Sequence, residues 1–186
     1  MTRLPMVDAD SRDPVLQPVF ERLKKRWGTV LHLYRVLGWS PPLVKAWGPF
    51  AWSLRFELGV SRRLRELMVI RIAEVLCARY EYQHHVHMAL DEGVTPDQVA
   101  ALSQWEISVL FDEQERMVLR LADELAMGSG ASATTMKTLK SAFSESEIME
   151  LLVTGAYYCA VARVVNSLDL DLEPGHEHLR ARNEPE

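Results

Sequence analysis

Apolar residues recur along this chain with the period of an α-helix over nearly its whole length. In residues 13–28, apolar side chains at Val15, Val19 and Leu23 follow one another every four positions. A glycine, Gly28, comes next, so the stretch has the pattern of an amphipathic helix with its stop signal. The same reasoning predicts further helices over residues 31–38, 40–59, 95–102, 112–130, 133–143 and 144–170. Strand patterns are nearly absent, and we therefore expect an all-α fold.

Residues 61–93 contain the longest helical pattern, from the cap residue Ser61 to the stop residue Gly93. As one helix these residues would span roughly 50 Å, which is long for a single domain. The segment is apolar almost all round before residues 77–80 and polar on one side after them. The pattern therefore predicts two helices with a break at 77–80.

Local signals define several of the other helices. Thr95 with Gln98, and Ser144 with Glu147, have the spacing of capping boxes. Pro49 lies inside the helix predicted over 40–59, so we expect it to bend or split that helix.

Composition bounds the class of protein. The chain has 186 residues, 48% of them hydrophobic, which is enough for one domain with a substantial core. We expect about eight helices in a single bundle over residues 1–186, with the core at about 16–173 and flexible terminal tails. No linker composition divides the chain.

Charge and apolar runs argue against several partners. A net charge of −5 disfavours nonspecific nucleic-acid binding. The longest apolar stretch, LLVTGAYYCAVARVV, contains Arg163 and is short for a membrane span, and the first residues have no apolar signal region. We therefore expect a cytoplasmic protein without nucleic-acid or membrane partners. Cys77 and Cys159 form neither a disulfide framework nor a zinc pattern, and both are expected to be small core residues.

Three of the six histidines lie within four positions, in the stretch ARYEYQHHVHMALDEG. On a helix, Glu81, His84 and His85 share one face, because residues three and four apart are neighbours. His87 points away and is expected to be exposed. The alternatives are an acid–base site made by Glu81 and His85, with His84 as a possible supporting residue, or a solvated polar face.

Glu66 lies in the mostly apolar stretch RELMVIRIAEVL, which predicts a buried helix. A buried carboxylate is costly unless it is paired or hydrogen-bonded. One candidate partner is His85, which would make an acid–base relay across two adjacent helices. The alternative is a structural ion pair with an arginine, for which Arg62, Arg63 and Arg71 are candidates.

These residues resemble the carboxymuconolactone decarboxylase and alkyl hydroperoxidase D-like superfamily, which is all-helical. Its redox-active branch carries a glutamate and, about a dozen residues later, a Cys-x-x-Cys-x-x-x-His run. Glu66 matches the glutamate and His85 the histidine, whereas Ala78 and Glu81 occupy the two cysteine positions. The likeness covers roughly residues 16–173 and includes the segments LRELMVIRIAE, GVTPDQVAAL and ELLVTGAYYCAVARVVNSLDLDLEP.

The resemblance implies a homo-oligomer and a decarboxylase-like activity. Because the dithiol is lost, we expect cofactor-independent acid–base chemistry, a decarboxylation or isomerisation of a small organic acid or lactone. Glu66, Glu81 and His85 are the expected catalytic residues, with no cofactor and no metal, because adjacent histidines on one helix diverge by about 100°. The alternatives are a thiol peroxidase that uses Cys77 and a non-catalytic oligomeric binding protein.

Overall fold

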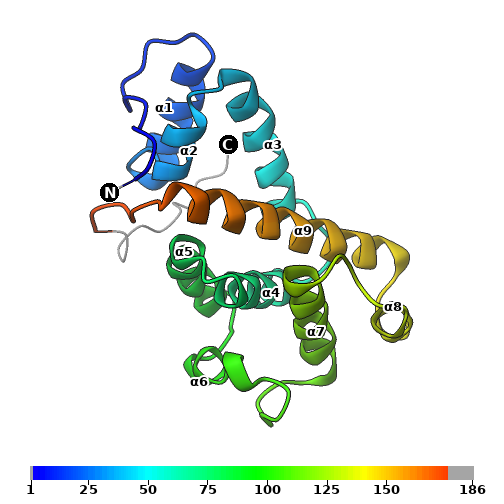
Figure 1. The fold of residues 1–186 in the computed structure, drawn as a ribbon. Helices are drawn as coiled ribbons and strands as arrows, with labels where there is room; N and C mark the ends of the chain where they lie inside the picture. The colour runs from blue at the N-terminus through cyan, green and yellow to red at the C-terminus, as the bar shows by residue number, and fades with distance from the viewer. Residues whose placement is uncertain (1, 176–186) are drawn as a thin grey trace. The chain divides into compact units, whose positions relative to one another are not determined.

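A computed structural model describes residues 2–175, which form nine α-helices and one short 3-10 helix and contain no strand (Figure 1). The predicted all-α fold is confirmed. The described residues divide into two compact units, one of residues 2–56 and 167–175 and the other of residues 57–166. One domain over the whole chain remains a prediction. The predicted flexible tail falls largely on residues 176–186, which lie outside the described residues.

The first unit contains α1 (Leu16–Trp27), α2 (His32–Leu37) and α3 (Pro41–Phe56). Gly28 ends α1 as predicted, in a left-handed conformation with φ of 76°. The helix α3 continues through Pro49, so a split at that proline is wrong. A small core joins the helices and the loop between α1 and α2, and consists of Leu16, Phe20, Val30 and Val44.

The second unit is organised around α4. Its elements are α4 (Arg62–Val75), α5 (Arg79–Asp91), α6 (Pro96–Ala100), the 3-10 helix Leu102–Gln104, α7 (Glu113–Met127), α8 (Ala133–Leu139) and α9 (Glu145–Leu168). The helix α4 packs against both α5 and α7. Nine of its 14 residues are buried, which explains why its sequence is apolar almost all round.

The break predicted at residues 77–80 is confirmed, because α4 ends at Val75 and α5 begins at Arg79. The junction is tight: the amide N–H of Ala78 donates to the carbonyl of Ala73 at 2.7 Å. Cys77 adopts a positive φ of 52°, a conformation that costs an L-residue about 1–2 kcal/mol relative to glycine. This turn folds α5 back along α4.

A buried polar network fixes the other end of the α4–α5 hairpin. Both capping boxes predicted from the sequence are present, and Gln98 has a second role besides its cap. Its amide nitrogen donates to the Glu115 carboxylate at 3.1 Å, and its oxygen accepts from Arg63 at 3.0 Å. Arg63 also pairs with Glu115 and donates to the carbonyl of Gly93. The starts of α4, α6 and α7 are thereby held together.

The helix α9 approaches α4 and α7 closely at Gly155, where an added Cβ would lie 2.4 Å from Leu125 Cδ1 and 3.2 Å from Met68 Sδ. Glu150, five residues earlier, accepts backbone N–H groups from Gly59 and Val60 just before α4. Among the described helices, α9 alone is long and apolar enough to cross a membrane by length and composition. Half of its apolar window is buried in the fold.

Candidate acid–base site

Glu66 on α4 and His85 on α5 are in direct contact, although 19 positions separate them in the sequence. The Nδ1 atom of His85 lies 2.7 Å from Oε2 of Glu66. The hairpin of α4 and α5 brings the two side chains together, and the predicted proximity is confirmed. At this distance the pair has the length of a charge-assisted hydrogen bond.

Glu81 lies on the other side of the same imidazole. Its Oε2 atom is 3.4 Å from Nε2 of His85, one helical turn along α5. Each ring nitrogen of His85 therefore faces a carboxylate, Glu66 at Nδ1 and Glu81 at Nε2. We call Glu66, Glu81 and His85 the triad.

The triad is almost completely shielded from solvent. The exposed fractions are 4% for Glu66, 4% for Glu81 and 1% for His85. Burial by itself would lower the pKa of His85, but the charge and hydrogen bond of Glu66 and then those of Glu81 raise it above its usual value. The balance favours an imidazolium held between two carboxylates.

An aromatic side chain of α9 packs against His85. Tyr158 of α9 meets the imidazole edge to face, with ring centroids 4.8 Å apart. Tyr157 packs in turn against Tyr158 at 5.2 Å. Tyr158 was not predicted as part of the site, because its position 73 residues after His85 gives no local spacing signal; only the family-like segment GAYYCA pointed to this region.

Of the three arginines considered as partners of Glu66, one lies beside it in the structure. Arg62 faces it, with Nε 3.6 Å from Oε1 of Glu66. Arg63 pairs instead with Glu115, and Arg71 with Asp123 and Glu74. Glu66 thus has both of the partners considered, a histidine and an arginine, on different oxygens.

Arg65 is a buried cation beside the triad that sequence reasoning did not single out. It is 5% exposed, and its Nε donates to the carbonyl of Val60 at 3.1 Å. Burial lowers the pKa of its guanidinium, and the neighbouring Glu66 charge opposes that effect. Glu150 and Tyr158 of α9 also act on this guanidinium.

The remaining histidines of the cluster lie apart from the triad contacts. His84 is buried and packs against Tyr80 in a tilted arrangement, with ring centroids 4.6 Å apart. His87 is half-buried, so the expectation that it is exposed is wrong. The neighbouring turns of α5 and the rest of the unit cover more of this helix than its polar sequence indicates.

The two cysteines differ from each other. Cys159 is buried as expected, and its burial raises the pKa of its thiol. Cys77 is exposed, so its expected place in the core is wrong. The reason is the break between α4 and α5, which puts Cys77 in the connecting turn rather than on a buried helix face.

The triad carboxylates lie on opposite sides of the imidazole, so their oxygens do not converge with a ring nitrogen on one point. Within residues 2–175 no group of three or more histidine, cysteine or carboxylate side chains is arranged to hold a metal ion.

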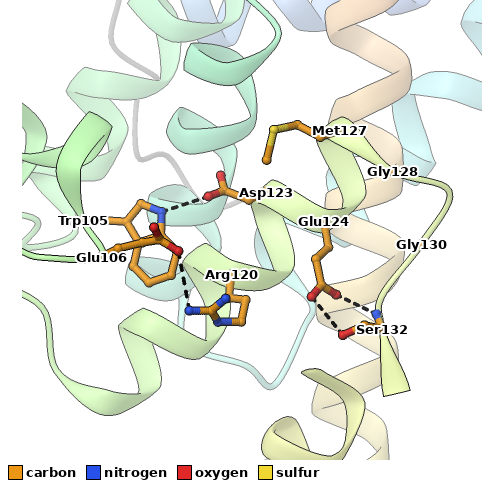
Figure 2. Close-up of a pocket in the computed structure, with 9 residues that line it drawn as sticks. All are labelled: Trp105, Glu106, Arg120, Asp123, Glu124, Met127, Gly128, Gly130 and Ser132. Atoms are coloured by element: carbon orange, nitrogen blue, oxygen red, sulfur yellow. Dashed lines mark hydrogen bonds and ion pairs between the residues drawn. The ribbon is translucent and has the colours of Figure 1, made fainter. Parts of the chain in front are cut away.

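A cavity of about 420 Å³ in the second unit does not include the triad (Figure 2). Trp105, Arg120, Asp123 and Met127 are among the residues that line it. Figure 2 shows that its polar groups engage one another: Trp105 Nε1 donates to Asp123 at 3.0 Å, and Arg120 pairs with Glu106 at 3.6 Å. The residues predicted for chemistry, Glu66, Glu81 and His85, are not among those that line this cavity.

The comparisons with known proteins agree with this architecture. Residues 41–124 match the model of the carboxymuconolactone decarboxylase family. No curated protein matches the chain. Three solved structures share its fold over nearly their whole length, at sequence identities that show the fold alone.

An uncharacterized peroxidase-related protein from Silicibacter sp. TM1040 has a TM-score of 0.80 at 17% identity, over 96% of this chain and 95% of that one. An alkylhydroperoxidase AhpD core protein from Ralstonia eutropha JMP134 has a TM-score of 0.80 at 15% identity, over 94% of each chain. A cysteine-to-alanine variant of the debrominase Bmp8, in complex with 2,3,4-tribromopyrrole, has a TM-score of 0.77 at 20% identity, over 95% of this chain and 96% of that one. The family match over residues 41–124 and the shared all-helical fold support the resemblance to the carboxymuconolactone decarboxylase and alkyl hydroperoxidase D-like superfamily that the motif around Glu66 and His85 indicates.

Proposed function

We propose that this chain is an enzyme that uses the triad for cofactor-independent acid–base chemistry on a small organic acid or lactone. The observation that carries the proposal is the buried histidine between two carboxylates, at 2.7 Å and 3.4 Å. Perturbed, buried titratable groups of this kind cluster at functional sites. In the redox branch of the superfamily, the position of Glu81 belongs to a thiol.

The two sides of His85 have different roles in this proposal. Nδ1–H donates to Glu66, and the short contact fixes the orientation of the ring. The contact between Nε2 and Glu81, at 3.4 Å, is longer than an ordinary hydrogen bond. Nε2–H can therefore donate to a substrate oxygen placed beside it, while Glu81 exchanges a proton with the substrate.

For a β-keto acid, the bond from the α-carbon to the carboxylate breaks and carbon dioxide leaves. The electron pair of that bond moves onto the carbonyl oxygen, which becomes an enolate oxygen stabilised by the Nε2–H donor of His85. The α-carbon then takes up a proton that Glu81 relays from water, which leaves hydroxide behind. For an isomerisation, Glu81 removes a proton from one carbon and returns it to another.

Thiol chemistry at Cys77 is the second candidate, and the exposure of this thiol favours it. A dithiol peroxidase needs a second thiol to resolve the sulfenic acid. The other cysteine, Cys159, is buried and its thiol has a raised pKa, which disfavours that role. We therefore place acid–base chemistry first.

The cellular setting follows the same proposal. A homo-oligomer in the cytoplasm, with a small organic acid or lactone as its substrate and without nucleic-acid or membrane partners, fits a metabolic enzyme with a buried acid–base site.

Turnover of β-keto acids and lactones by the full-length chain tests the proposal. His85→Ala should reduce the rate by roughly 10²-fold or more, the usual scale for a lost acid–base group. Cys77→Ser is the matched control, because it changes a nearby group outside the triad, and its rate should equal that of the unmodified chain. Circular dichroism on both variants verifies folding. Peroxide reduction that is abolished by Cys77→Ser would replace acid–base chemistry with thiol chemistry.

A further inference from the structure

The two carboxylate oxygens of Glu66 have different partners. Oε2 meets Nδ1 of His85 at 2.7 Å, whereas Oε1 faces Nε of Arg62 at 3.6 Å. Arg62 in turn reaches a second carboxylate, with its Nη1 atom 3.1 Å from Oε1 of Glu92. Five charged groups therefore follow one another with alternating sign: Glu92, Arg62, Glu66, His85 and Glu81.

Helix geometry fixes this row. Arg62 and Glu66 are one turn apart on α4, and Glu81 and His85 are one turn apart on α5. Glu92 is the C-cap of α5, so the antiparallel hairpin places it beside the start of α4. Each member is thus held by a helix position rather than by a flexible loop.

Exposure changes sharply along the row. The side chains of Arg62 and Glu92 are 29% and 32% exposed. The three triad side chains are between 1% and 5% exposed. The Arg62–Glu92 pair is therefore the end of the row that solvent and salt can reach.

We propose that Arg62, balanced by Glu92, is a positioning residue that acts through Glu66 and sets the pH at which the buried triad loses a proton. The positive charge of Arg62 offsets part of the negative charge of Glu66, the carboxylate that stabilises the His85 imidazolium. Arg62 therefore lowers the proton affinity of His85. Glu92 offsets part of the Arg62 charge. Arg62 and Glu92 would thus regulate the proposed acid–base site, and this inference rests on the proposed function.

The sign of each perturbation follows from charge. When the Arg62 cation is lost, its charge no longer offsets that of Glu66. The negative charge near His85 is then stronger, so the triad keeps its proton to a higher pH. Loss of the Glu92 anion leaves the Arg62 charge uncompensated, so the triad releases its proton at a lower pH. A purely structural role for the pair would destabilise the fold in both variants without opposite shifts.

The other groups that face the triad stay constant in both variants. Arg65 lies beside Glu66 on α4, and Tyr158 of α9 packs against the imidazole. Glu150 of α9 acts on Arg65. A shift between variants therefore reports on Arg62 and Glu92.

The test is an NMR titration of the His85 imidazole in the full-length chain, labelled with ¹⁵N at histidine, between about pH 4 and pH 11. His85→Gln assigns the signal. In Arg62→Gln, which keeps a donor for Glu66 Oε1, the midpoint should rise by roughly half a unit or more, a threefold change in proton affinity. In Glu92→Gln it should fall, and Arg62→Lys should restore the original value.

Arg120→Gln is the matched control, because Arg120 is also 3.6 Å from its glutamate partner and lies in the same unit, away from the triad. Its midpoint should equal that of the unmodified chain. In about 1 M salt the Arg62→Gln shift should shrink, since the pair is partly exposed. A midpoint in Arg62→Gln that stays or falls, or the absence of any midpoint in the range, would overturn the proposal. The titration measures the imidazole itself, so the effect of Arg62 can be observed even in a chain that turns over no lactone or keto acid. Failure of this inference and failure of the proposed function are therefore distinguishable.

Discussion

The substitution Glu66→Gln tests whether the buried ion pair of Glu66 and His85 loses its stabilising effect as His85 loses its proton. It removes the carboxylate charge that lies 2.7 Å from a histidine of 1% exposure. Removal of one partner from a buried ion pair costs about 3–5 kcal/mol. The glutamine oxygen can still accept the Nδ1–H group, and His85 can lose its proton. We therefore expect a loss of about 2–3 kcal/mol in unfolding free energy near pH 6.

This loss should depend on pH in one direction. The folded pKa of His85 is raised, so its contribution is fully present below the unfolded value of about 6.5 and is lost as the pH rises through the folded value. Above that value His85 is neutral in the unmodified chain as well. The difference between the two chains should then fall to about 1 kcal/mol, that of a neutral hydrogen bond.

Glu115→Gln is the matched control, because Glu115 is a carboxylate of 2% exposure whose main partner, Arg63, keeps its charge at all accessible pH. Urea unfolding of the full-length chain near pH 6 and near pH 10 measures both differences. The Glu115→Gln difference should change little between the two conditions. A Glu66→Gln difference that stays constant, or grows, as the pH rises would refute the claim that Glu66 holds an imidazolium.

Two further predictions concern the turn and the triad. Cys77→Gly should raise the unfolding free energy by about 1 kcal/mol in urea denaturation, because φ is 52° at this position and glycine adopts it without strain; an unchanged or lower value would contradict the strain at this turn. Glu81→Gln removes one of the groups that raise the pKa of His85, so the midpoint of the His85 imidazole titration by NMR should move to lower pH. A shift to higher pH would contradict the stabilisation of the imidazolium by Glu81.

Much of this arrangement follows from local rules. The carboxylate of Glu66 in an apolar helix requires a partner, and the polar face of the next helix supplies His85, so their contact was predictable. The change of polarity near Cys77 predicted the helix break, and the spacing of Thr95 and Gln98 predicted a capping box. In each case the sequence pattern on which the prediction rests lies within a single helix or one helical hairpin.

Other features depend on packing between distant segments. Tyr158 reaches His85 from α9, and no sequence spacing encodes such a contact. The exposure of Cys77 depends on which residues form the turn, a boundary that periodicity locates only to within a few residues. Arg62 and Arg63 are adjacent in sequence, but Arg63 pairs with the buried Glu115, whereas Arg62 pairs with Glu66.

The most direct test of the central claim is deuterium incorporation from D₂O into the carbon next to the carbonyl of a β-keto acid product or lactone, measured beside peroxide consumption on the same preparations. An acid–base triad predicts enzyme-dependent incorporation that falls by roughly 10²-fold in His85→Ala and is unchanged in Cys77→Ser, with little peroxide consumed. Peroxide consumption that requires Cys77, without incorporation above the rate in buffer, would contradict the account.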